Sequence, residues 1–187
     1  MKIHPESDWT KPNDWCPHPG RWHSTDPQST ELEVSDLVGA LVGALQPDYV
    51  VETGTCLGQT AACIAIALQR NGRGHLDTIE PDAQRAQFAR TRVAAFMEGP
   101  PMTVHEVKSL DFTPTGPIGF AWLDSRMELR VPEFERYRPW MRPGTVVGFH
   151  DTAPHHGDWA DELHSLAGTR AITLRTPRGV TFLEVVQ

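Results

Sequence analysis

Apolar and polar residues succeed one another along the chain in a way that predicts short strands separated by helices. The first helical segment has leucines four residues apart, and Thr30 with Glu33 predicts a capping box at its start. Asp82 is placed to begin the third helical segment, and Pro132 falls in the predicted first turn of the fourth. The predicted strands are residues 49–53, 75–80, 102–107, 118–124, 144–151, 171–176 and 179–186, and the segments predicted to be helical are 29–47, 59–74, 82–97, 131–141 and 159–168.

This alternation predicts an α/β fold with a mostly parallel sheet and right-handed crossovers. The last two strands are joined by only a short Pro-Arg-Gly turn, so they are expected to pair antiparallel. Ligands of open α/β sheets bind at the carboxyl ends of the strands. Several predicted strands end on or just before polar residues, namely Glu52, Glu80, Ser109, Asp111, Asp124, His150 and Asp151. We therefore expect a site at this edge of the sheet.

Composition limits the classes of partner. The chain has 187 residues, which suits one domain, and its net charge of −7 disfavours a nucleic-acid partner. The N-terminus lacks a signal-like apolar segment, and no apolar run approaches the roughly 20 residues of a membrane span. Three cysteines without paired spacing fit reduced thiols. These features predict a cytoplasmic protein without a membrane partner, and they are compatible with a homodimer.

The first part of the chain differs from the rest. Residues 1–28 are rich in Pro, Trp and His and show neither helical nor strand periodicity. We expect them to form an irregular arm or lid that covers a substrate pocket or contacts a partner subunit. The regular domain is expected to span residues 29–187.

The segment Tyr-Val-Val-Glu-Thr-Gly-Thr-Cys-Leu-Gly-Gln-Thr-Ala places Glu52 ahead of two glycines, Gly54 and Gly58. A dinucleotide-binding loop carries three glycines, and a carboxylate beside a pyrophosphate would repel it. S-adenosylmethionine is cationic at its sulfonium and carries no phosphate, so it suits this loop better. Two other classes stay open: a nicotinamide-dependent oxidoreductase, although the chain has no Tyr-x-x-x-Lys pair, and a non-catalytic domain that binds a partner.

Taken with the later segments Leu-Asp-Thr-Ile-Glu-Pro-Asp, Ala-Trp-Leu-Asp-Ser and Arg-Pro-Gly-Thr-Val-Val-Gly-Phe-His-Asp-Thr, this loop resembles the class I S-adenosylmethionine-dependent methyltransferases. The resemblance is to the small catechol and caffeoyl-CoA type O-methyltransferases and to bacterial sugar or antibiotic O-methyltransferases. It implies a Rossmann-like seven-stranded sheet with one antiparallel strand and helices on both faces. It also implies O-methylation of a small hydroxylated metabolite, such as a sugar, a phenol or a natural-product scaffold.

The resemblance also implies a set of cofactor-binding residues. The glycine loop would line the methionine part of the cofactor, the residues after the second strand would bind its ribose, and those after the third would flank its adenine. The set is Glu52, Thr53, Gly54, Thr55, Gly58, Thr60, Glu80, Pro81, Ser109, Leu110 and Asp124.

Catalysis is expected at Asp124, His150 and Asp151, which match the positions where catechol-type enzymes hold a divalent metal. Oxygen ligands suit Mg²⁺, whereas an imidazole favours Mn²⁺, Zn²⁺ or iron. The lysine base of those enzymes is replaced here by Met127. We therefore expect a divalent metal held by Asp124, His150 and Asp151 to assist the reaction, and the alternative is a metal-independent reaction with His150 or a neighbour as base.

Overall fold

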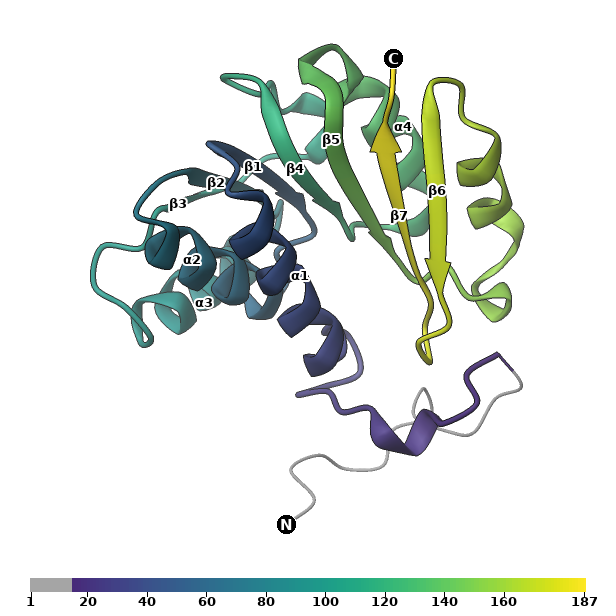
Figure 1. Cartoon of the computed structure of the whole chain (residues 1–187). Coiled ribbons are helices and arrows are strands. Elements are labelled where there is room, and N and C mark those ends of the chain that lie inside the picture. Colours follow the sequence, from purple (N-terminus) through teal and green to yellow (C-terminus); the bar gives the residue numbers. More distant parts are fainter. Residues whose placement is uncertain (1–14) are drawn as a thin grey trace.

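The computed structural model describes residues 15–187, in which the predicted strands form a single sheet (Figure 1). Residues 1–14 of the predicted arm lie outside the described residues. The seven strands lie in the order β3-β2-β1-β4-β5-β7-β6, which confirms the predicted fold class. They are β1 (Tyr49–Thr53), β2 (His75–Ile79), β3 (Met102–His105), β4 (Ile118–Leu123), β5 (Met141–His150), β6 (Thr169–Leu174) and β7 (Val180–Val185).

Strand direction follows the predicted connections. β1 pairs in parallel with β2 and β4, and β4 pairs in parallel with β5, as crossovers through helices require. β7 runs antiparallel to both of its neighbours, β5 and β6. The final strand is thus inserted antiparallel, as expected, and the carboxyl ends of β1, β4 and β5 meet at one edge.

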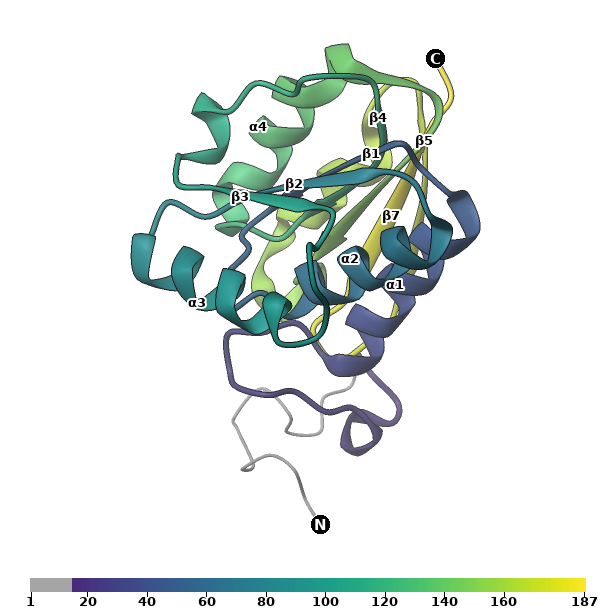
Figure 2. The ribbon, with the colours of Figure 1, turned by 90° about the vertical axis from the view of Figure 1, so that its left-hand side faces the viewer.

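Helices cover both faces of the sheet (Figure 2). One apolar core joins a first face to α1 and α2 through residues such as Val38, Ile64 and Phe120. The other core joins the opposite face to α4 and to the 3₁₀ segment at residues 158–165 through Phe134, Phe149 and Leu163, among others. The helices are α1 (Leu32–Leu45), α2 (Gln59–Asn71), α3 (Ala83–Ala94) and α4 (Met127–Tyr137), with the 3₁₀ segment η6 at Asp158–Ser165.

Local chemistry explains two of the helix ends. The Asp82 carboxylate accepts hydrogen bonds from the backbone N–H groups of Gln84 and Arg85, so its predicted role at the start of α3 is confirmed. Gly72 ends α2 in the left-handed conformation that glycine adopts readily.

Three local predictions were wrong. The capping box does not form, because the Thr30 hydroxyl donates to Asp124 instead and the residue that caps α1 is Glu31. Helix α4 begins at Met127, so Pro132 lies inside it rather than in its first turn. The segment 159–168 is a 3₁₀ helix in its first part, and its buried residues Ala160 and Leu163 follow the three-residue turn of that helix.

Within residues 15–187, no helix has both the length and the apolar character needed to cross a lipid bilayer.

Candidate active site

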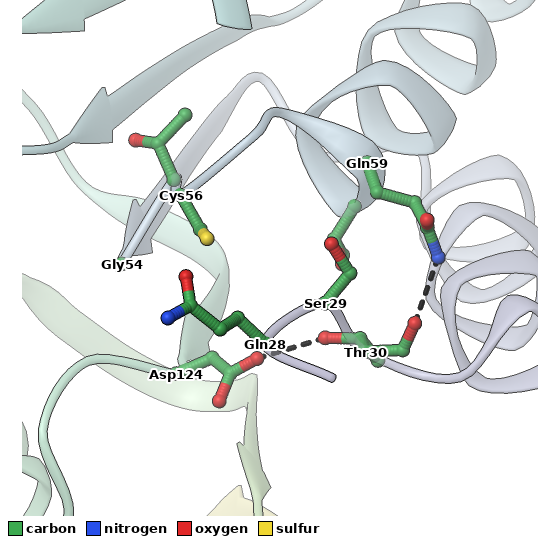
Figure 3. A pocket seen from close by; sticks show the side chains of 9 residues that line it. Gln28, Ser29, Thr30, Gly54, Cys56, Gln59 and Asp124 are labelled. Atoms are coloured by element: carbon green, nitrogen blue, oxygen red, sulfur yellow. Dashed lines mark hydrogen bonds between the residues drawn. The ribbon is translucent and has the colours of Figure 1, made fainter. Parts of the chain in front are cut away.

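A narrow crevice opens at the carboxyl ends of β1 and β4, where the glycine loop passes into α2 (Figure 3). Its space is about 290 Å³, part of which is open to solvent. Three segments far apart in sequence form its walls: the residues before α1, the loop after β1, and the end of β4. The lining residues are Gln28, Ser29, Thr30, Gly54, Thr55, Cys56, Gln59, Thr60 and Asp124.

The two glycines of the loop are required by close packing. Gly54 has a φ of +78°, and a Cβ there would collide with the carbonyl oxygen of Asp124. Gly58 has a φ of +76°, and a Cβ there would lie 2.8 Å from the Cβ of Ala89. Larger residues would therefore push the loop away from β4 and α3, so the loop can follow this path only with glycine at both positions.

Residues 24–31 close one side of the crevice through hydrogen bonds to the loop and to β4. The Thr30 hydroxyl donates to Asp124 Oδ2 at 2.8 Å, and its carbonyl accepts from Gln59 Nε2 at 2.8 Å (Figure 3). The Thr25 hydroxyl donates to Gln59 Oε1 at 2.7 Å. The part of the predicted arm nearest the regular domain is therefore ordered against the site.

Acidic groups lie in and around the crevice, and Asp124 is the acid among its lining residues. Glu52 is buried beneath the loop and accepts a hydrogen bond from Thr78. Burial, together with the neighbouring carboxylates of Asp124 and Glu80, raises the pKa of Glu52 to about 8. The Glu80 carboxylate accepts the backbone N–H of Cys56 at 2.9 Å, which fastens the loop to the end of β2.

Asp124, His150 and Asp151 come together at the ends of β4 and β5, as predicted, with potential ligand atoms within 4.8 Å of one another. They do not stand alone, because three further charged residues join them in a closed set of buried contacts. We call this set the ion ring; its members are Glu31, Asp124, Arg130, His150, Asp151 and Arg178.

His150 is enclosed within the ion ring, with a side-chain exposure of 0%. Its Nε2 lies 2.6 Å from Glu31 Oε2, and its Nδ1 lies 3.3 Å from Asp124 Oδ1. Burial by itself would lower the pKa of His150, but the carboxylates of Asp124, Asp151 and Glu31 outweigh it and raise that pKa to about 9. The imidazole is therefore a cation at neutral pH in this arrangement.

The two aspartates are held as anions. Burial opposes their charge, but His150 and arginine guanidinium groups overcome it and lower the pKa of both Asp124 and Asp151. Asp151 also has a φ of 57°, in the left-handed region that few non-glycine residues adopt.

Comparison with known proteins identifies the family. A model described as a methyltransferase domain matches residues 51–152, which is more than half of the chain. The chain belongs to this methyltransferase family. The matched range, residues 51–152, includes the glycine loop, the acid at the end of β2, and both ends of β4 and β5. Among curated proteins, none matches the chain.

Solved structures share the fold. The O-methyltransferase TomG from Streptomyces achromogenes, solved with S-adenosylmethionine (SAM), has a TM-score of 0.72 and 21% identity over 86% of this chain and 82% of its own. An O-methyltransferase from Bacillus cereus, solved with SAH, has a TM-score of 0.71 and 17% identity over 86% and 84%. A putative caffeoyl-CoA O-methyltransferase from Staphylococcus aureus has a TM-score of 0.72 and 17% identity over 89% and 87%.

In this methyltransferase, the predicted cofactor residues fall into two groups. Gly54, Thr55, Thr60 and Asp124 line the crevice directly. The others lie around it: Glu52 is beneath the loop, Thr53 donates to Glu133 on the α4 side, Gly58 begins α2, Glu80 holds the loop with the exposed Pro81 after it, and Ser109 and Leu110 form a 3₁₀ turn after β3.

Sequence reasoning missed the charged partners of the ion ring. Glu31 looked like an ordinary residue near a helix start, and Arg178 like part of a turn. For Arg130 there was a signal: it lies one helical turn after Met127, the position of the missing lysine base, and buried acids need cationic partners. Gln59 could also have been found, because it directly follows Gly58 at the start of α2.

The variant Glu52→Gln is expected to remove a pH dependence of stability. The pKa of Glu52 is about 8 in the folded protein against an ordinary 4.5, so the wild type loses stability as pH rises from about 4.5 to about 8. A neutral glutamine avoids this loss. The variant should exceed the wild type by about 3–5 kcal/mol in free energy of unfolding at pH 9 and by little at pH 5, since one pKa unit corresponds to about 1.36 kcal/mol.

Urea denaturation at both pH values measures this difference, with the exposed Glu98→Gln as a matched control. A variant that gains equally at pH 5 and pH 9 would contradict the raised pKa.

Proposed function

We propose that this methyltransferase transfers the methyl group of S-adenosylmethionine to a hydroxyl oxygen of a small metabolite, such as a sugar, a phenol or a natural-product scaffold. The observation that carries the proposal is the crevice itself, which has a glycine loop, the carboxylate of Asp124 and no basic side chain among its lining residues. Such a site favours a cationic sulfonium and disfavours a pyrophosphate. The cofactors named for TomG and the Bacillus cereus enzyme support the choice.

In this proposal, each end of the cofactor meets a different strand end. The backbone from Gly54 to Thr60 accommodates the methionine part. Glu80 binds the ribose hydroxyls. A carboxylate has about four acceptor sites, and the N–H groups of Cys56 and Asp82 take one each, so acceptor sites remain for the two hydroxyls. The 3₁₀ turn at Ser109 and Leu110 flanks the adenine.

The reaction is an in-line displacement at the sulfonium carbon. The acceptor oxygen forms a bond to the methyl carbon, the carbon–sulfur bond breaks, and the products are the methyl ether, S-adenosylhomocysteine and a proton. Much of the rate enhancement comes from holding the two reactants in line.

The predicted catalytic roles of His150, Asp124 and Asp151 stay predictions. His150 is enclosed, bonded to Glu31 and protonated at neutral pH in this arrangement, so it would need to leave Glu31 before acting as a base. Arg130 and Arg178 already neutralise the two aspartates, so the proposed reaction includes no metal ion.

In this proposal, residues 24–31 form a lid over the cofactor crevice. Three of the residues that line the crevice belong to this segment, so the segment narrows the space that a ligand could enter. A cofactor that combines a nucleoside and an amino acid therefore enters when the segment swings away from Gln59 and Asp124.

Calorimetry should detect binding of S-adenosylmethionine and S-adenosylhomocysteine but not of NAD. The variant Glu80→Ala should weaken cofactor affinity about 10- to 100-fold, since a hydrogen bond to a charged group contributes about 1.5–3 kcal/mol. Glu80→Gln separates the two roles of this residue, because it keeps an acceptor for the Cys56 N–H while losing the charge.

The exposed Glu98→Ala is the control for this series. Binding of NAD alone would falsify the proposed cofactor, and unchanged affinity in Glu80→Ala would remove Glu80 from the ribose site. Formation of S-adenosylhomocysteine across a panel of phenols and sugars then identifies the acceptor.

Thr30→Val tests the lid. The change keeps the shape of the side chain but removes the hydrogen bond to Asp124, so the segment should open more often. Association and dissociation rate constants for S-adenosylhomocysteine should then both rise several-fold while the dissociation constant changes less. Stopped-flow fluorescence measures both rates, and Thr91→Val on the exposed face of α3 is the control. Unchanged rates in Thr30→Val would show that entry does not depend on this segment.

A further inference from the structure

The space between Asp124 and Asp151 is filled by an arginine. Arg130 Nη2 lies 2.8 Å from Asp124 Oδ1 and 3.1 Å from Asp151 Oδ2, so a single nitrogen bridges the two carboxylates. A metal ion shared by these two aspartates would occupy the same place, because Mg²⁺ or Ca²⁺ binds oxygen at about 2.0–2.6 Å.

The other donors of Arg130 hold the guanidinium in this position. Its Nε donates to the carbonyl of Ser125 at 3.0 Å, and its Nη1 donates to the carbonyl of His150. The side chain is 2% exposed, and its guanidinium carbon lies 5.3 Å from the ring centroid of Trp159. Displacing it would leave a buried cation without its carboxylates, which is strongly unfavourable.

A second arginine covers the other side of Asp151. Arg178 donates from Nε to Oδ1 at 2.6 Å and from Nη2 to Oδ2 at 3.0 Å, the two-pronged contact that a guanidinium makes with a carboxylate. Its Nη1 donates to the carbonyl of Ser29, which joins this contact to the lid. Both oxygens of Asp151 are thus already bound to cationic donors.

Asp124 is bound on both oxygens as well, by Arg130 on Oδ1 and by Thr30 on Oδ2. One feature fits a metal: His150 Nδ1 is buried and makes no hydrogen bond in the described residues. A single nitrogen does not make a site when every carboxylate oxygen that would share the ion already has a partner.

We propose that the ion ring replaces a divalent metal in this methyltransferase, with Arg130 in the place of the cation between Asp124 and Asp151. The ring places two guanidinium groups among its carboxylates, and each oxygen of Asp124 and Asp151 already has a hydrogen-bond donor. The proposal rests on the proposed function in one respect: it implies that methyl transfer proceeds in the presence of a chelator. Its main tests measure metal binding and do not depend on activity.

The first test is made on the wild type. Purified without chelator, the protein should contain far less than one equivalent of any divalent metal by mass spectrometry. Its melting temperature should not change with millimolar Mg²⁺ or Mn²⁺, and S-adenosylmethionine should bind equally in EDTA. One equivalent of metal, or a metal-dependent rise in melting temperature that Asp124→Asn abolishes, would overturn the proposal.

The second test opens the place that Arg130 fills. Arg130→Gln leaves two buried carboxylates facing each other, so the variant should bind Mn²⁺ at least about tenfold more tightly than the wild type, as followed by the electron spin resonance of free Mn²⁺. Adding Asp124→Asn should cancel this gain. Arg136→Gln is the matched control, because Arg136 lies on the same helix and, within residues 15–187, its hydrogen bonds are to Leu110 and Thr113.

Failure of Arg130→Gln to gain Mn²⁺ affinity would contradict the position assigned to Arg130. If this variant does not fold, the metal content and thermal response of the wild type decide. The outcomes also separate this inference from the proposed function: bound metal with intact cofactor binding counts against the ion ring alone, whereas loss of cofactor binding under every condition counts against the methyltransferase reaction with S-adenosylmethionine.

Discussion

The bridge that Arg130 makes between Asp124 and Asp151 is the contact on which the site depends. Two carboxylates at neighbouring strand ends, almost removed from water, repel each other unless a cation lies between them. The guanidinium supplies that cation from within the chain. Because Arg130 comes from α4, the same contact fixes the position of this helix over the ends of β4 and β5. The parallel strands thus meet at an edge whose charges are balanced internally.

The same network extends to the residues before α1. Glu31 contacts His150, Thr30 contacts Asp124, and Arg178 contacts the carbonyl of Ser29. A segment that carries almost no periodic pattern is thereby held against the crevice by charge and hydrogen bonding rather than by a large apolar surface. Contacts of this kind can break one by one, which is what the proposed opening of this segment requires.

The fold that this chain shares with TomG and the other O-methyltransferases explains where the crevice lies but not how its chemistry proceeds. Sheets of this topology place ligands at the carboxyl ends of their strands whatever the reaction. What distinguishes one such enzyme from another is the set of side chains at those ends. In this chain the set is enclosed by two arginines, and that enclosure separates it from a set of acids open to a metal ion.

The sequence alone determined the order of strands and helices, the antiparallel last strand and the meeting of Asp124, His150 and Asp151, because these follow from apolar periodicity, short turns and chain direction. Gly54 and Gly58 were also recognisable, although their reason, contact with the Asp124 carbonyl and Ala89, was not. Only the tertiary structure decided the partners of the acids. Arg130 reaches Asp124 across 6 residues, Arg178 reaches Asp151 across 27, and Glu31 reaches His150 across 119. No local pattern records which buried charge will neutralise which.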